Sequence, residues 1–101
     1  MANLTKAEIE KVAFQMNHGI LVPWLFMKTP SGSQGFGGYD LRKEDFLYRY
    51  MSSILQICAV ESFEELLGIA VRIRIEGGTI VAIGHVLKDK WFTPAELWEI
   101  K

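Results

Sequence analysis

Arg72 and Arg74 are the side chains best suited to bind an anion. They are separated by one residue, so in a β-strand both lie on the same face. His85, Lys88 and Trp91 follow shortly after them. Guanidinium groups bind phosphate through paired N–H donors, and an aromatic ring offers a surface for a stacked base. These five residues predict a site for a phosphate-bearing ligand. The alternative is a solvated face on which arginine stems cover the sheet.

A glycine-rich segment is the second candidate. Three glycines within four residues imply positive φ angles or a close backbone approach. Successive amides in such a loop can form an anion-binding nest, and a helix N-terminus expected nearby would favour negative charge. Walker and dinucleotide-binding motifs are absent, and the alternative is a turn that lets Phe36 dock and the chain reverse. The candidate ligand-binding residues here are Gln34, Gly35, Phe36, Gly37, Gly38 and Tyr39.

Patterns typical of catalysis and metal binding are weak. No histidine or cysteine pair has ligand spacing, so we expect no metal site and no cofactor. Cys58 falls on the apolar stripe of an expected helix, which predicts a core residue. Ser31 or Ser33 with His85 could form a nucleophile–base pair, but no nucleophile elbow is present. We therefore expect a binding protein rather than an enzyme, with a small hydrolase as an alternative.

Length and composition favour a single domain, 1–101. The chain has 101 residues, half of them hydrophobic, which is enough for one core. The formal charge of −1 disfavours non-specific nucleic-acid binding, although a local basic face is compatible with it. One cysteine excludes an intrachain disulfide, and we see neither a signal peptide nor an 18-residue apolar run. These features predict a cytoplasmic protein with no membrane contact.

The first two thirds of the chain predict mainly helices. Thr5 to Glu8 resembles a capping box ahead of a helix over about 6–17. An edge strand or extended segment follows over 20–27, since Pro23 cannot donate to a sheet ladder. Residues 29–38 predict a loop. A core helix is expected over 41–58 and a short helix over 62–67, where a second capping box begins.

The strongest strand signal comes near the C-terminus. Alternating residues over about 69–76 precede Gly77-Gly78 and a return strand over about 79–86 follows, which predicts a hairpin with a two-residue turn. That register pairs Arg74 with Val81, Arg72 with Ile83, Ala70 with His85, Ile75 with Ile80 and Ile73 with Ala82. A short strand at Trp91-Phe92 and a helix after Pro94 follow. The predicted fold is α+β, a small antiparallel sheet built on this hairpin and packed against helices at about 6–17, 41–58 and 62–67.

Segments 34–39, 61–72 and 82–92 together resemble small uncharacterised proteins of bacteriophages and prophages. The first reads Gln-Gly-Phe-Gly-Gly-Tyr and the last ends in Lys-Asp-Lys-Trp-Phe. The resemblance implies a phage accessory protein in the host cytoplasm that counteracts host defence by sequestering a small anionic signal such as a cyclic nucleotide. The alternative is a protein–protein inhibitor of a host defence or CRISPR component. A homo-oligomer is expected, because apolar content is high for so short a chain.

Overall fold

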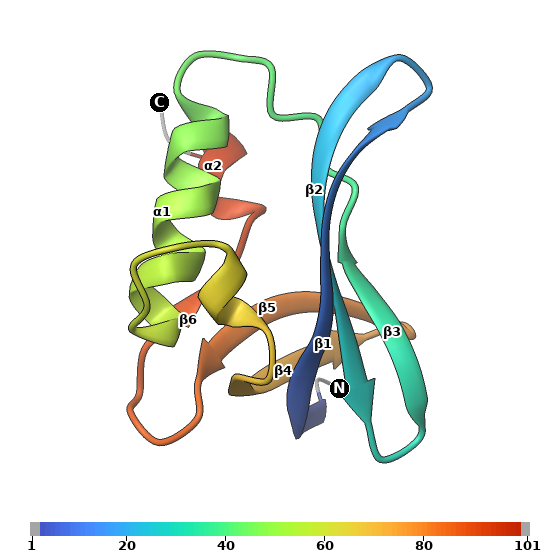
Figure 1. The fold of residues 1–101 in the computed structure, drawn as a ribbon, viewed down its shortest axis with the longest axis vertical. Helices are drawn as coiled ribbons and strands as arrows, with labels where there is room; N and C mark the ends of the chain where they lie inside the picture. Colours follow the sequence, from blue (N-terminus) through green and yellow to red (C-terminus); the bar gives the residue numbers. More distant parts are fainter. Residues whose placement is uncertain (1–2, 100–101) are drawn as a thin grey trace.

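A single antiparallel sheet dominates the computed structural model, which describes residues 3–99 and the side chains of residues 4–97 (Figure 1). The elements are β1 (Asn3–Asn17), β2 (Ile20–Thr29), β3 (Gly32–Gly37), α1 (Phe46–Cys58), the 3-10 helix η1 (Glu64–Leu66), β4 (Ala70–Glu76), β5 (Thr79–His85), β6 (Trp91–Phe92) and α2 (Glu96–Glu99). The strand order is β3-β2-β1-β4-β5-β6. The predicted α+β fold, a small sheet packed against three helices, is therefore wrong.

The N-terminal segment is a long strand, β1, and not the predicted helix over 6–17. Ala7 and Ile9 are buried whereas Lys6 and Glu8 are exposed, which is the two-residue alternation of a strand. Glu8, which together with Thr5 suggested a capping box, lies on the outer face of the sheet. Local sequence fits both structures here, and pairing with strands on both sides favours the strand.

The turn after β1 explains part of this error. His18 and Gly19 have φ angles of 54° and 81°, and they join Asn17 directly to Ile20 in a two-residue hairpin. Hairpin turns of this kind and helix C-termini both need a left-handed backbone, and both favour glycine. The Asn-His-Gly sequence is therefore compatible with either a helix end or a hairpin.

A bulge bends β1 at Glu10, which has no partner between Ile9 opposite Met27 and Lys11 opposite Phe26. The first part of β1 pairs with β4, and the part from Glu8 onward pairs with β2. Bulges bend a strand and increase its twist, so the two halves of the sheet cross in Figure 1. The sheet curls far enough for Gln34 on β3 to donate from Nε2 to the Gly78 carbonyl oxygen at 3.4 Å.

The segment over 29–38 contains strand β3, so the prediction of a loop is wrong. Thr29 Oγ1 donates to the Gly32 carbonyl oxygen at 2.7 Å and closes the tight turn between β2 and β3. The segment over 20–27, predicted as an edge strand or an extended segment, is strand β2. It lies between β3 and β1, so the predicted edge position is wrong. Pro23 lies beyond the stretch of β2 that pairs with β3, so β2 has a free edge there, as the prolyl nitrogen requires.

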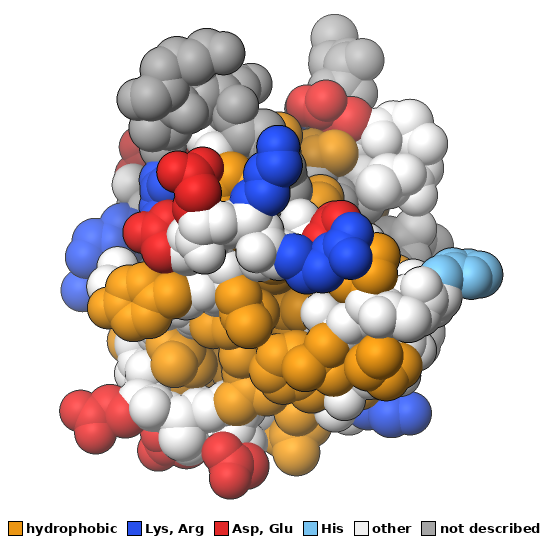
Figure 2. All heavy atoms as spheres, turned by 90° about the horizontal axis from the view of Figure 1, so that it is seen from above, with side chains coloured by type: hydrophobic (Ala, Val, Ile, Leu, Met, Phe, Trp, Pro, Cys, Tyr) orange, Lys and Arg blue, Asp and Glu red, His pale blue; other side chains and the backbone are white. Residues whose placement is uncertain are grey.

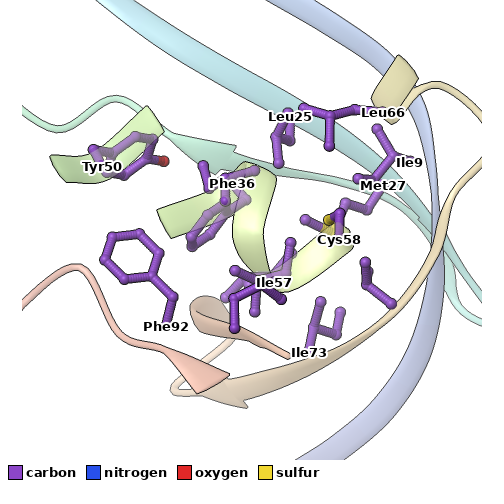
Figure 3. Packing of buried hydrophobic residues seen from close by; sticks show 14 of the residues in the cluster. Ile9, Leu25, Met27, Phe36, Tyr50, Ile57, Cys58, Leu66, Ile73 and Phe92 are labelled. Carbon is purple, nitrogen blue, oxygen red and sulfur yellow. The ribbon is translucent and has the colours of Figure 1, made fainter. Parts of the chain in front are cut away.

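Helix α1 covers the concave face of the sheet and completes the core (Figures 1 and 3). It begins at Phe46, later than predicted, and ends where Ala59 adopts a left-handed φ of 58°. Figure 3 shows Tyr50 and Ile57 of α1 directed toward side chains of the sheet. Its buried residues are Phe46, Tyr50, Ile54, Ile57 and Cys58. Within the described residues, no helix has both the length and the apolar character needed to cross a membrane.

The short helix predicted over 62–67 is the single 3-10 turn η1. The Glu65 carboxylate accepts hydrogen bonds from the N–H groups of Glu61 and Ser62, each at 3.0 Å, and from the Ser62 hydroxyl at 3.2 Å. These bonds, led by the one from Glu61, lower the pKa of Glu65. Half of the expected capping box is therefore present: Glu65 binds the Ser62 N–H, whereas the Ser62 hydroxyl bonds to Glu65 and not to a backbone amide.

The C-terminal hairpin forms at the predicted place, with Gly77 and Gly78 at φ angles of 59° and 79°. A bulge at Val81 changes the predicted register beyond Ile75 and Ile80. The observed pairs are Arg74 with Ala82, Ile73 with Ile83, Arg72 with Gly84 and Val71 with His85, in place of Arg74–Val81, Ile73–Ala82, Arg72–Ile83 and Ala70–His85. The bulge buries Ile83 and places Gly84 on the outer face. Strand β6 and helix α2 are present as predicted.

Candidate functional site

A row of residues crosses four strands on the face opposite α1. Register pairs Lys6 of β1 with Arg72 of β4, Arg72 with Gly84 of β5, and Gly84 with Trp91 of β6. Arg74 lies two residues along β4, on the same face. We call Lys6, Arg72, Arg74 and Trp91 the outer-face cluster. The structure therefore brings together three of the residues predicted for anion binding.

Both arginines of the outer-face cluster lie against the indole ring. The Cζ atoms of Arg72 and Arg74 are 5.2 and 5.1 Å from the Trp91 ring centroid, within cation–π range. The ring rests on the backbone of β5, since a Cβ added to Gly84 would lie 2.7 Å from ring atoms Cδ2 and Cε3. Gly84 thus lets the indole approach the sheet, and the indole restricts both guanidinium groups.

The two arginines differ in the use of their donors. Arg72 donates from Nε to the His85 carbonyl oxygen at 2.9 Å and from Nη2 to the Lys88 carbonyl oxygen at 2.8 Å. It is therefore fixed to the loop between β5 and β6. The Arg74 side chain has no hydrogen bond or ion pair with any other described residue. Its half-buried guanidinium retains its donors for a ligand.

The outer-face cluster forms a small positively charged area. The two ion pairs among the described residues, Arg42–Asp40 and Arg49–Asp45, lie before and at the start of α1, so neither involves the outer-face cluster. A shallow depression of about 480 Å³ opens beside Leu4, Thr5, Lys6 and Arg72. On the same face, Glu8 follows Lys6 on β1 and Glu76 follows Arg74 on β4. These two carboxylates therefore limit the positive area along the strand direction.

The glycine segment lies on β3, which β2 and β1 separate from β4. An added Cβ at Gly35 would lie 3.0 Å from the Trp24 ring, and one at Gly38 would lie 2.8 Å from it. Phe36 is buried and stacks on Tyr50, with ring centroids 6.0 Å apart. The glycines therefore make room for Trp24 while Phe36 docks in the core, and the segment does not join the arginines.

The other predicted residues of this segment also have packing roles. Gln34 bonds to the turn at Gly78, and a Cβ on Gly37 would overlap the carbonyl oxygen of Pro23. Tyr39 packs edge-on against Phe36 with centroids 6.3 Å apart, and burial raises the pKa of Tyr39. These contacts support the alternative of a structural segment over an anion nest.

Cys58 and Tyr50 are buried in the core. Burial raises the pKa of the Cys58 thiol to about 11, so the reactive thiolate is scarce at neutral pH. Burial, with a smaller effect from Tyr39, raises the pKa of Tyr50, whose hydroxyl has no hydrogen-bond partner among the described residues. Both groups therefore belong to the core.

The structure does not assemble the serine–histidine pair. Ser33 Oγ donates to Glu10 at 2.6 Å, and His85 Nδ1 accepts backbone N–H bonds from Leu87 and Lys88 at 3.0 Å each. No hydrogen bond joins either serine to His85 within the described part of the chain. In residues 3–99 we also find no group of three histidine, cysteine or acidic residues placed to hold a metal.

Sequence reasoning missed Lys6 and Gly84. Lys6 fell within the predicted helix, although the alternation of Lys6, Glu8 and Glu10 with Ala7 and Ile9 was a strand signal. Gly84 was placed on the wrong face because no local sequence signal marks the bulge at Val81.

The chain was compared with protein-family models, with curated proteins and with solved structures. None of the three comparisons finds a match. The function is therefore argued from the geometry of the outer-face cluster.

Proposed function

We propose that the protein binds a small nucleotide-like anion on the outer-face cluster and releases it unchanged. The observation that carries this proposal is Arg74, a guanidinium held beside Trp91 with no hydrogen bond or ion pair to other described residues. Lys6 and Arg72 add positive charge on the same face. Cations without carboxylate partners, held in place by an aromatic ring, favour phosphate recognition.

Each residue of the cluster has a distinct part in this proposal. Arg74 binds a phosphate oxygen pair, and Lys6 supplies a second positive charge from β1. Arg72 positions the loop after β5 and keeps its remaining donors for the ligand. The half-buried Trp91 offers an aromatic edge to a base.

The extent of the positive area supports a compact ligand. Side chains two residues apart on a strand are about 7 Å apart, so Lys6, Arg72 and Arg74 fill only two rows between Glu8 and Glu76. A long single-stranded nucleic acid needs a continuous positive path. A ligand with one or two phosphates, such as a cyclic dinucleotide, fits this area better.

We propose that such a binding protein serves a bacteriophage. Under this proposal it acts in the host cytoplasm and sequesters a signal of host defence, which the resemblance of segments 34–39, 61–72 and 82–92 implies. Sequestration needs binding alone, and this fits a face without an assembled catalytic pair.

Isothermal titration with cyclic di-AMP, cyclic di-GMP, cyclic triadenylate and octathymidylate tests the proposal. We expect Arg74→Gln to weaken binding by roughly 10- to 100-fold, the value of a charge-assisted hydrogen bond. Lys43→Gln removes an exposed cation before α1 and is the matched control. Equal affinities for Arg74→Gln and the wild type would exclude this site. Tightest binding of octathymidylate would favour a nucleic-acid polymer instead.

One observation favours the second candidate, a protein-binding function. On one face of the β1–β2 hairpin, Phe14, Met16 and Leu21 are 45%, 63% and 49% exposed, and Met16 pairs with Leu21 across the strands. Figure 2 looks down on this end of the molecule and shows hydrophobic side chains gathered there. We expect self-association that Met16→Ser weakens in analytical ultracentrifugation. If the protein is a monomer at all concentrations, the homo-oligomer is excluded, and binding to a different protein is the form of this function that remains to be tested.

A further inference from the structure

The loop over 86–90, between β5 and β6, is closed by a histidine side chain. His85 Nδ1 accepts hydrogen bonds from the backbone N–H groups of both Leu87 and Lys88, each at 3.0 Å. A ring nitrogen that accepts a hydrogen bond carries no proton, so these contacts require a neutral imidazole protonated on Nε2. The closed loop is therefore compatible with only one protonation state of His85.

The same loop holds Arg72 of the outer-face cluster. Arg72 bonds to the carbonyl oxygens of His85 and Lys88, so the imidazole and the guanidinium bind the same turn from two sides. Two backbone bonds complete the turn, from His85 N to the Lys90 oxygen at 2.9 Å and from Lys90 N to the Lys88 oxygen at 2.8 Å. A change at the imidazole therefore reaches one arginine of the proposed site within a single turn.

We propose that His85 is a pH-sensitive switch that opens loop 86–90 and releases Arg72 on acidification. Protonation places a hydrogen on Nδ1, which then points at two N–H donors in place of accepting from them. Both bonds are lost, and the Lys88 carbonyl moves away from Arg72. His85 pairs with Val71, a core-facing residue, so the added charge lies on the opposite face from the ligand. Loss of the Arg72 anchor therefore lowers ligand affinity.

No other group is bonded to the imidazole. Within the described residues, His85 has no ion pair and no side-chain bond besides those to Leu87 and Lys88. The charged or titratable residues on the elements around β5 are Arg72, Arg74 and Glu76 on β4, Lys88, Asp89 and Lys90 in the loop, and Tyr48, Arg49, Tyr50 and Cys58 on α1, with none on β3 or β6. The switch therefore depends on the two backbone bonds.

The sign of the pH effect follows from these bonds. Only the neutral imidazole accepts both N–H bonds, so the loop is closed at the higher pH and opens when acidification protonates Nδ1.

Amide hydrogen exchange by NMR between pH 7.5 and 5.5 tests the switch without a ligand. After correction for intrinsic exchange, we expect protection of the Leu87 and Lys88 amides to fall at least 10-fold in the wild type. His85→Asn keeps a side-chain oxygen that accepts from N–H groups two and three residues ahead and does not titrate, so its loop stays closed. His18→Asn changes the other histidine, in the β1–β2 turn, and retains the wild-type response. Equal protection at both pH values in the wild type would overturn the switch.

The link to the site rests on the proposed function and needs a second readout. We expect the Arg72 Nε–H signal to broaden at pH 5.5 in the wild type only, and cyclic di-AMP to bind several-fold more weakly. Loop opening with an unchanged Arg72 signal and unchanged cyclic di-AMP affinity would overturn the link. Absence of cyclic di-AMP binding at both pH values would count against the proposed function for that ligand, whereas the exchange data would still decide the switch.

Discussion

Two tryptophans on the outer face both pack against glycines, but the side chains around the two rings differ. Trp24 lies over Gly35 and Gly38, and Trp91 lies over Gly84, so each ring approaches a backbone that has no Cβ in the way. Trp24 stacks on Phe26 with centroids 5.8 Å apart, and its Nε1 is buried without a partner among the described residues. Trp91 instead has two guanidinium groups within 5.2 Å.

The difference comes from the side chains that nearby strands place beside each ring. β1 offers Ala13 opposite Trp24, whereas Arg72 and Arg74 of β4 lie beside Trp91 across β5. One ring therefore forms an apolar patch that stabilises the sheet, and the other fixes cations at the surface. We expect changes near Trp24 to affect stability alone, and changes near Trp91 to affect stability and ligand binding.

Gly38→Ala has the largest expected effect. Gly38 has a φ of 78°, and the new Cβ would lie 2.8 Å from the Trp24 ring, so backbone strain and overpacking together cost about 3 kcal/mol. Urea denaturation measures the loss. Gly19→Ala is the matched control, because Gly19 has a φ of 81° but no atom within 4 Å of the added Cβ, and about 1 kcal/mol is expected. Equal losses in both variants would show that Trp24 does not depend on this glycine.

Gly84→Ala tests whether Trp91, unlike Trp24, affects ligand affinity as well as stability. The new Cβ would lie 2.7 Å from Trp91 in ordinary strand backbone, so overpacking alone costs about 2 kcal/mol. The displaced ring no longer holds Arg72 and Arg74, so under the proposed function the affinity for cyclic di-AMP falls as well. Urea denaturation and calorimetric titration measure both quantities, with Gly35→Ala beside Trp24 as the control that changes stability only. Full ligand affinity in Gly84→Ala would contradict the role given to Trp91.

Removal of single cations has the smallest expected effect on stability. Lys11 lies 5.5 Å from the Phe26 ring and Arg74 lies 5.1 Å from the Trp91 ring, so Lys11→Gln and Arg74→Gln each cost about 0.5 kcal/mol. Thermal unfolding measures both. The two variants differ in ligand binding, which only Arg74→Gln weakens. A loss of affinity in Lys11→Gln of the same size would extend the site across β1 to the Trp24 patch.

The β4–β5 and β1–β2 hairpins show what local sequence could reveal. Gly77-Gly78 is flanked by β-branched residues, which alternate with polar residues before the turn, and the positions of both strands and of the turn were predicted correctly. The register beyond Ile75 and Ile80 was not. His18-Gly19 forms a similar turn, but helix-favouring residues precede it, and the pairing that selects the strand comes from β2 and β4. Long-range pairing of this kind cannot be read from one segment.

The same limit applies to the candidate site. The alternation of Arg72 and Arg74 placed them on one face, and their sequence proximity to Trp91 suggested that the three lie together, as the distances to the ring confirm. Lys6 required knowledge of the β1–β4 pairing. The sequence left the glycines at 35 and 38 open between an anion nest and a structural turn. Their role depends on the ring of Trp24 on another strand, which local spacing does not show.

The change of partner strand along β1, near the bend at Glu10, also determines when the outer-face cluster can form during folding. The hairpin of β1 and β2 joins neighbouring segments, whereas the first part of β1 finds its partner only at β4, where Asn3 lies opposite Ile75. Contacts between segments so distant in the chain form slowly, because a long loop must close first. On the ribosome, the β1–β3 region can therefore form early, while the outer-face cluster appears only after Trp91 has left the exit tunnel.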